Sequence, residues 1–394
     1  MADQNFSNQL KQLALEFESM TDNYPHLLEQ AISDPESGKW SPDYFTSLEP
    51  YGSEIQHKTP PSRLLVNSPE VLSSDTLSLV LLGSHGAELV RTFYGDKIYY
   101  DDIYIYDDNA IKRYQIYHSD GDTKPVLIEL LVLTEEGSPS QFLTYYDGAS
   151  LIINYTSNNQ GILSKSYIPS DGALKEYKTM RIDFEDGQVK EIVDLANSSL
   201  IYSLEEAAKP LSTLLAEYQD RVMAMIIAGL KERPPEAEDV SGMVLEYFSE
   251  SPFPPSIGLP TASERAKWKG DSVIWWFNAA DMEYFYECEF FYQDNSDELL
   301  NAKLEELDFD YVVDIVDAFY LELAGRIVNS PEIRALLSAD DNFFCTAHDY
   351  TCGTDLGLLK KFLPNSLYQE IESEVGAPEE LGEDQVLSAF GKLN

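Results

Sequence analysis

The sequence predicts an α+β protein, in which N-terminal helices and an antiparallel β-meander are followed by a mixed α+β domain. Residues 75–194 consist of short β-rich runs separated by turn residues, with no helical pattern between them. Two Asp-Gly dipeptides, at 147–148 and 186–187, each stand between two such runs and favour tight hairpins. At Ser203 the hydrophobic period lengthens from two residues to between three and four, which indicates helix. Consecutive hairpins without crossover helices predict an antiparallel sheet.

The first predicted domain comprises residues 1–200. Residues 3–33 have the apolar spacing of helices, with one stripe before Pro25 and another after it. The stretch 34–74 is rich in Pro and Ser, and no element is predicted there. The strands expected after it are Leu77–Leu82, Glu88–Tyr94, Lys97–Tyr106, Lys112–His118, Val126–Thr134, Phe142–Tyr146, Leu151–Thr156, Ile162–Ile168, Lys178–Phe184 and Val189–Val193.

The second predicted domain comprises residues 201–394 and opens with a long helix. Ser203 is a suitable N-cap, acidic residues follow it, and the apolar stripe continues to Ile226. Arg233 and two prolines end that helix. The later elements expected are strands at Met243–Phe248, Val273–Phe277 and Phe343–Ala347, a Pro-rich loop at 251–260, a helical block at 296–338 and two short helices within 355–374.

The composition restricts the kind of partner. The chain has 394 residues, 69 of them acidic and 27 basic, and a net charge of −42. Because phosphates attract Lys and Arg, we expect no direct nucleic-acid partner and no docking on anionic membranes. The expected partner is a basic protein. Three cysteines and an N-terminus without a signal-peptide pattern favour a cytoplasmic location.

One cluster of residues suggests metal or nucleophile chemistry, namely Cys345, His348 and Cys352. A structural zinc site takes four ligands, and this segment supplies three. A Cys–His nucleophile pair needs a third group to orient the imidazole, but the adjacent Asp349 would point to the opposite face of a strand. The sequence also lacks a phosphate-binding glycine motif. We therefore expect no catalytic residue, no metal and no cofactor.

An acidic helix is the first candidate binding surface. Residues 281–325 contain 14 Asp or Glu against one Lys. The helix expected there has an apolar face for the core, formed by Phe309, Val312, Val313, Val316, Phe319, Tyr320 and Leu323. Asp310, Asp314 and Asp317 lie on the opposite face, where like charges repel. The near-absence of Lys favours a basic partner or a role in solubility.

A stripe of tyrosine and aspartate is the second candidate. Along the strand expected near residues 97–106, Asp102, Tyr104, Tyr106 and Asp108 share one face, and isoleucines 103 and 105 share the other. If the isoleucines face the core, the tyrosines are exposed between carboxylates. Tyrosine is frequent at binding hot spots, and carboxylates attract a basic protein.

The second domain resembles a family in the order of its short sequence strings. After the long helix come EYF at 246–248, PPSIGLPTASER at 254–265, WWFN at 275–278, an acidic helical block and FFCTAHD at 343–349. This order is similar to that of uncharacterised bacterial proteins encoded beside polymorphic toxins, many of which serve as immunity proteins. The resemblance covers about residues 200–375. It implies an acidic protein that occludes a toxin and has no catalytic residues.

Three functional hypotheses follow. The first is an immunity or antitoxin protein that neutralises a basic toxin by charge-complementary binding. The second is a hydrolase that uses carboxylates or the Cys345 and His348 region. The third is a nucleic-acid mimic, whose carboxylates block a nucleic-acid-binding enzyme. Identification of the partner separates them.

Overall fold

In a computed structural model the chain forms two compact units, residues 1–208 and 209–394. The predicted α+β class is confirmed. The structure describes residues 2–369 with internal gaps, the longer of which are 33–36, 58–64, 269–277, 287–295 and 351–359.

Among the described residues of the first unit, twelve strands form one antiparallel sheet in strictly sequential order. All ten predicted strands are present. The strands are β1 (Ser37–Ser41), β2 (Thr76–Gly83), β3 (Gly86–Tyr94), β4 (Lys97–Asp107), β5 (Ala110–Ser119), β6 (Asp122–Leu133), β7 (Pro139–Tyr146), β8 (Ala149–Asn158), β9 (Gly161–Ser170), β10 (Ala173–Glu185), β11 (Gln188–Asp194) and β12 (Ser199–Ser203). The sequence did not predict β1 or β12.

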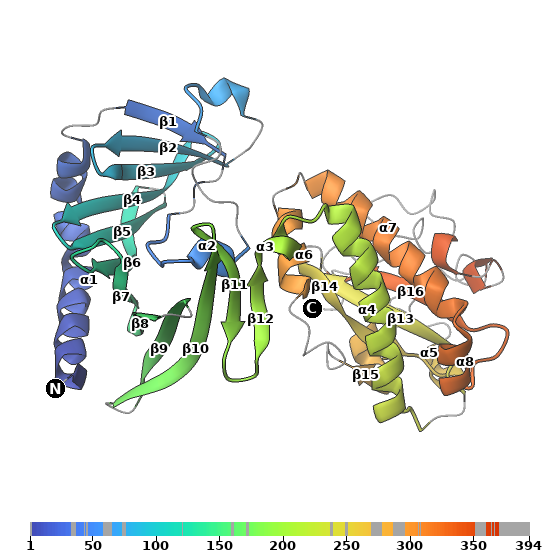
Figure 1. Ribbon diagram of the computed structural model, residues 1–394. Helices are drawn as coiled ribbons and strands as arrows, with labels where there is room; N and C mark the ends of the chain where they lie inside the picture. Colours follow the sequence, from blue (N-terminus) through green and yellow to red (C-terminus); the bar gives the residue numbers. More distant parts are fainter. Residues whose placement is uncertain are drawn as a thin grey trace. The chain divides into compact units, whose positions relative to one another are not determined.

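One face of this sheet is covered by α1 (Ala2–Ile32), a single helix that continues through Pro25 (Figure 1). It lies against β3, β4, β6 and β7. Leu13 and Met20 are its most deeply buried side chains, and such burial contributes about 1.5–3 kcal/mol per residue. The strand residues that complete this core are Leu89, Ile103, Tyr114, Ile116, Ile128, Leu143 and Ile152.

The opposite face is covered by residues 46–57, which we call the strap. The strap includes the short helix α2 (Gly52–Ile55). Leu48 and Tyr51 pack on the sheet, where the ring of Tyr51 contacts those of Tyr155 and Phe184 edge-on. Strands that both α1 and the strap contact, such as β4 and β6, therefore have protein on both faces, unlike an antiparallel sheet that exposes one side to water.

Among the described residues of the second unit, four strands form a sheet in the order β15-β14-β13-β16. They are β13 (Gly242–Phe248), β14 (Ser251–Leu259), β15 (Tyr284–Tyr286) and β16 (Phe344–Asp349), and β13 and β16 are parallel. One face packs on α4 (Leu211–Glu232), α6 (Ser296–Glu305), α7 (Phe309–Val328) and α8 (Pro331–Leu336). The expected strands at 243–248 and 343–347 and the helical block are thus present.

Three predictions for the second predicted domain, residues 201–394, were wrong. The expected loop at 251–260 is β14, which tolerates its prolines because Pro254 and Pro255 fall at a shift in register with β13, where no ladder hydrogen bond is lost. The long helix from Ser203 is two helices, α3 (Leu204–Ala207) and α4, since Pro210 interrupts it. Val313 is exposed rather than part of the core. The strand expected at 273–277 lies outside the described residues, as does most of 355–374.

Candidate functional site

The tyrosine and aspartate stripe of β4 is largely buried, so the expectation that it is exposed was wrong. The exposed fraction is 1% for Asp102 and 7% for Tyr104, and Tyr106 is half-buried. Asp108, in the following turn, is exposed. Ile103 does face the α1 core as predicted, but the strap covers the other face of the strand. The stripe therefore offers no continuous surface to a partner.

The buried polar groups of this face hold the strap on the sheet. Arg113 donates from Nε to Asp102 at 2.8 Å and from Nη1 to Glu129 at 2.7 Å. Glu129 in turn accepts the Ser47 hydroxyl and the Leu48 backbone N–H, both at 2.7 Å. The hydroxyl of Tyr104 donates to the Thr46 carbonyl at 2.6 Å. These residues thus have a structural role.

Two carboxyl groups near this cluster have perturbed pKa values. Burial raises the pKa of Asp102, and the guanidinium of Arg113 opposes that shift. Burial also raises the pKa of Glu49, in the strap, to about 7, and the negative charge of Glu129 adds to the shift. The chain therefore contains a carboxyl group that titrates near neutral pH.

The acidic face of α7 is only partly free. Asp314 is exposed, as predicted. Asp317 is half-buried and accepts a hydrogen bond from the Tyr247 hydroxyl at 3.4 Å. The side chain of Asp310 lies outside the described residues. Asp314 thus remains a candidate for contact with a basic partner, whereas Asp317 also belongs to the edge of the core.

Cys345 and His348 do not form a pair. On β16 their side chains point to opposite faces of the sheet, Cys345 into the helix-covered core and His348 to the other side. Burial raises the pKa of the Cys345 thiol and lowers that of His348. Within the part of the chain that the structure describes, no three Cys, His, Asp or Glu side chains come together as metal ligands. Cys352 lies outside that part.

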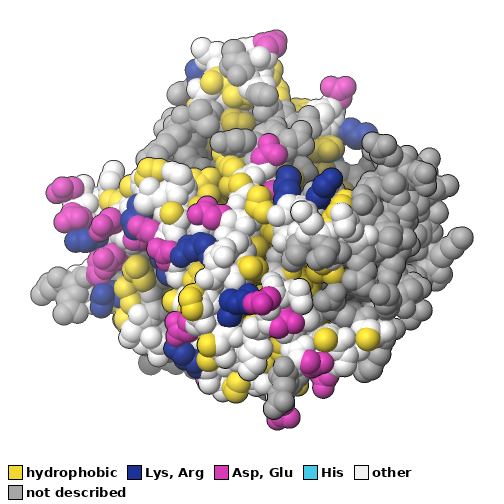
Figure 2. Space-filling view, turned by 90° about the vertical axis from the view of Figure 1, so that its right-hand side faces the viewer, with side chains coloured by type: hydrophobic (Ala, Val, Ile, Leu, Met, Phe, Trp, Pro, Cys, Tyr) yellow, Lys and Arg dark blue, Asp and Glu magenta, His cyan; other side chains and the backbone are white. Residues whose placement is uncertain are grey.

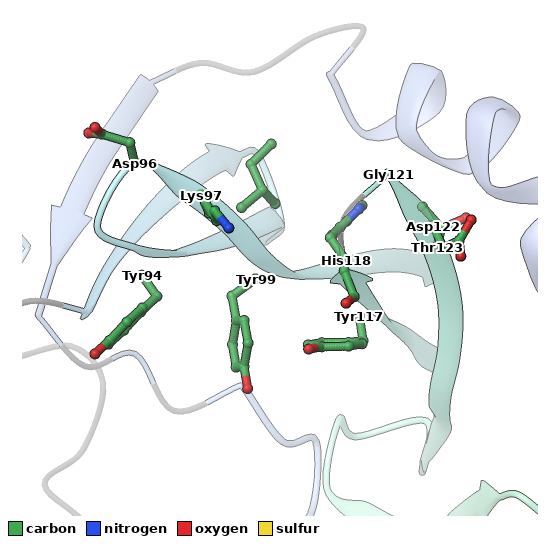
Figure 3. A pocket seen from close by; sticks show the side chains of 11 residues that line it. Tyr94, Asp96, Lys97, Tyr99, Tyr117, His118, Gly121, Asp122 and Thr123 are labelled. Carbon is green, nitrogen blue, oxygen red and sulfur yellow. The ribbon is translucent and has the colours of Figure 1, made fainter.

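A pocket at one end of the large sheet brings together residues that the sequence did not single out. It has a volume of about 610 Å³ and lies between the β3–β4 and β5–β6 hairpin ends. Tyr94, Tyr99 and Tyr117 line it, and their rings project to the same side of the strands (Figure 3). We call this cavity the tyrosine pocket. Its volume lies in the range of ordinary ligand sites.

Two rings of the tyrosine pocket, those of Tyr94 and Tyr99, are exposed, and the Tyr99 ring is held by its neighbours. The exposed fraction is 62% for Tyr94 and 42% for Tyr99. The Tyr99 ring lies edge-on to that of Tyr117, with centroids 5.0 Å apart, and edge-on to that of Tyr100 at 4.7 Å. Contacts of this kind restrict the rings and reduce the entropy lost on binding.

A β-bulge explains why Tyr99 points into the pocket. In the β3–β4 ladder Phe93 pairs with Ile98 and Thr92 pairs with Tyr100, so Tyr99 is an extra residue without a partner on β3. A bulge redirects the side chain that it carries. Strict alternation along the sequence cannot locate such a residue. The only feature of the sequence that pointed to this site was the high density of tyrosine around residues 99–106.

The wall of the pocket contains a histidine fixed by a buried carboxylate. Asp101 accepts two hydrogen bonds from Arg91, at 2.7 and 2.8 Å, and lies 3.2 Å from His118 Nε2. Tyr24 of α1 also donates to Asp101. The charge of Asp101 is thus balanced inside the protein, and the His118 ring is held in place. Asp96, Lys97 and Asp122 line the pocket in addition.

The acidic residues alone do not mark a site. On the face drawn in Figure 2, Asp and Glu side chains are scattered among Lys, Arg and hydrophobic groups rather than gathered in one patch.

None of the helices in the described part of the chain is long and apolar enough to cross a membrane. Comparison with known protein families, curated proteins and solved structures finds no match for this chain. The site must therefore be interpreted from its own geometry.

Proposed function

We propose that this chain is a binding protein for a basic protein partner, and that it acts as an immunity or antitoxin protein. The observation that supports this most is the charge. Residues 1–208 contain 33 Asp and Glu against 14 Lys and Arg, and residues 209–394 contain 36 against 13. Carboxylates therefore outnumber basic side chains by more than two to one in each unit.

Such a charge favours rapid capture of a cationic protein. Carboxylates attract a basic partner over distances comparable to the Debye length, about 8 Å at physiological ionic strength. Steering of this kind raises association rates by roughly 10–10³-fold. An immunity protein benefits from it, because a toxin made in the same cell must be bound before it acts. The order of elements in the second unit, which resembles that of toxin-associated proteins, supports the same interpretation.

The test is to isolate the chain from its native host with its stoichiometric partner and to measure their association. We expect a basic partner whose on-rate falls at least about tenfold between low and physiological salt. Asp314→Lys should lower that on-rate roughly twofold if α7 faces the partner. Glu136→Lys, in the exposed β6–β7 turn, changes the net charge equally and serves as the control.

An on-rate that does not change with salt concentration contradicts the proposal. A partner that the chain displaces from DNA or RNA indicates the nucleic-acid mimic instead.

One observation favours the hydrolase alternative. His118 is among the residues that line the pocket, and the buried Asp101 orients its imidazole on the α1 side of the sheet, as a general base requires. A hydrolase should release p-nitrophenol from ester or phosphate substrates at a rate that His118→Gln abolishes. A rate no higher than that of the buffer contradicts this alternative.

A further inference from the structure

We propose that the tyrosine pocket receives one lysine or arginine side chain of the basic partner. This inference rests on the proposed function and specifies where the partner is anchored. It is carried by the three rings of Tyr94, Tyr99 and Tyr117 together with the negative charges of Asp96 and Asp122, two other residues of the same pocket.

The rings provide an environment that suits a cation. The faces of aromatic rings carry negative charge density and attract ammonium and guanidinium groups within about 6 Å of the ring centre. Tyr94 and Tyr99 are exposed, and all three rings project to one side of the strands (Figure 3). The methylene groups of a Lys or Arg side chain would cover apolar ring surface while the charged end lies among the rings.

The charged residues of the pocket have opposing effects on its affinity for a cation. The proposal therefore predicts whether each substitution weakens or strengthens binding. Asp96 and Asp122 line the pocket with their carboxylates pointing away from the three rings (Figure 3), so they favour a cation by their charge and not by contact, whereas Lys97 opposes it. Asp101 contributes little, because Arg91 already balances its charge. Removal of Asp96 or Asp122 should therefore weaken cation binding, and removal of Lys97 should strengthen it.

An anionic occupant is less compatible with the surroundings. The first unit has more than twice as many acidic as basic residues, so a phosphate or carboxylate would be repelled on approach. Binding of an anion would be visible as a shift of the tyrosine signals with an acidic peptide.

The experiment uses the full chain with tyrosine replaced by 3-fluorotyrosine, and hexa-arginine, hexa-lysine and hexa-glutamate as probes. We expect the fluorine signals of Tyr94, Tyr99 and Tyr117 to shift with the two basic peptides at low salt and not with hexa-glutamate. Tyr99→Leu should raise the dissociation constant of hexa-arginine about tenfold, while Tyr99→Phe, which keeps the ring, should change it less than twofold. Asp96→Asn and Asp122→Asn should each raise it, and Lys97→Ala should lower it.

Tyr177→Leu is the matched control. Tyr177 is 68% exposed and, like Tyr99, is an extra residue at a register shift, here between β9 and β10, but it does not line the pocket. Thermal melts establish that each variant is folded. If hexa-arginine binds the Tyr99→Leu and Tyr177→Leu variants equally, the pocket is not the anchor, yet binding of a basic partner stands. The pocket is not a cation site if hexa-glutamate binds more tightly than the basic peptides, or if neither basic peptide shifts the fluorine signals. The salt dependence of the native partner's on-rate tests the proposed function separately.

Discussion

Replacement of Glu49 by Gln should stabilise the first unit above neutral pH. Glu49 lies in the strap, and burial together with the charge of Glu129 raises the pKa of its carboxyl to about 7, although Lys178 opposes the shift. The folded chain therefore keeps this proton up to about pH 7, whereas the unfolded chain loses it near pH 4.5. Between these values the unfolded state binds fewer protons, so folding stability falls as the pH rises.

The magnitude follows from the difference between the two pKa values. A gap of about 2.5 units corresponds to about 3 kcal/mol at most, of which about 2–3 kcal/mol is lost between pH 5 and pH 8. Gln has no charge and avoids this loss. The stability of Glu49→Gln relative to the native chain should thus rise by that amount over the same range.

Native-state hydrogen exchange of amides in β5 and β6 measures the free energy of unfolding of the first unit by itself. The measurement is made at pH 5 and pH 8 for the native chain, Glu49→Gln and the control Glu136→Gln, which alters an exposed turn. A Glu49→Gln effect that is the same at both pH values, or one matched by the control, refutes the reasoning.

Two further predictions concern buried polar groups. Arg113→Met should cost the first unit about 3–5 kcal/mol of unfolding free energy, because it leaves Asp102 and Glu129 buried without their cation. The same hydrogen exchange measures this loss, and a loss below about 1 kcal/mol contradicts the structural role of the cluster. Cys345 should resist alkylation in the native chain at pH 8 and react after denaturation, since burial both shields the thiol and raises its pKa. Peptide mapping by mass spectrometry measures its labelling, and native labelling as fast as that of a free thiol contradicts the prediction.

Local patterns were enough to predict the meander. Hairpins depend on turn chemistry and on alternation over a few residues, and both are visible at Asp147 and Asp186, each of which has a positive φ before a glycine. β1 was not predictable in this way, because its short run Ser37–Ser41 forms a strand only by pairing with β2 and with Val66. β14 was missed because its prolines indicate a loop unless the register shift opposite them is known.

The predicted binding stripe was wrong for a different reason. Alternation separated the two faces of β4 correctly, since Ile103 and Tyr104 do lie on opposite sides. It could not show that a segment from the Pro- and Ser-rich stretch covers the polar face. That covering depends on contacts such as Ser47 with Glu129, which are 82 residues apart in the sequence. Buried ion pairs on a strand therefore resemble a solvent-exposed face when only the sequence is considered.

The same covering explains why Tyr94 and Tyr99 are exposed at an end of the sheet and not in its middle. With α1 on one face and the strap on the other, the middle of β4 has no surface for a partner. At the β3–β4 hairpin end the bulge at Tyr99 turns a ring outward beside Tyr117. An acidic protein that had only to remain soluble would gain nothing from exposed tyrosines held in this arrangement. Under the proposed cation site the charges around these rings set the affinity, so the sign of the Lys97→Ala effect is the most informative single measurement on this site.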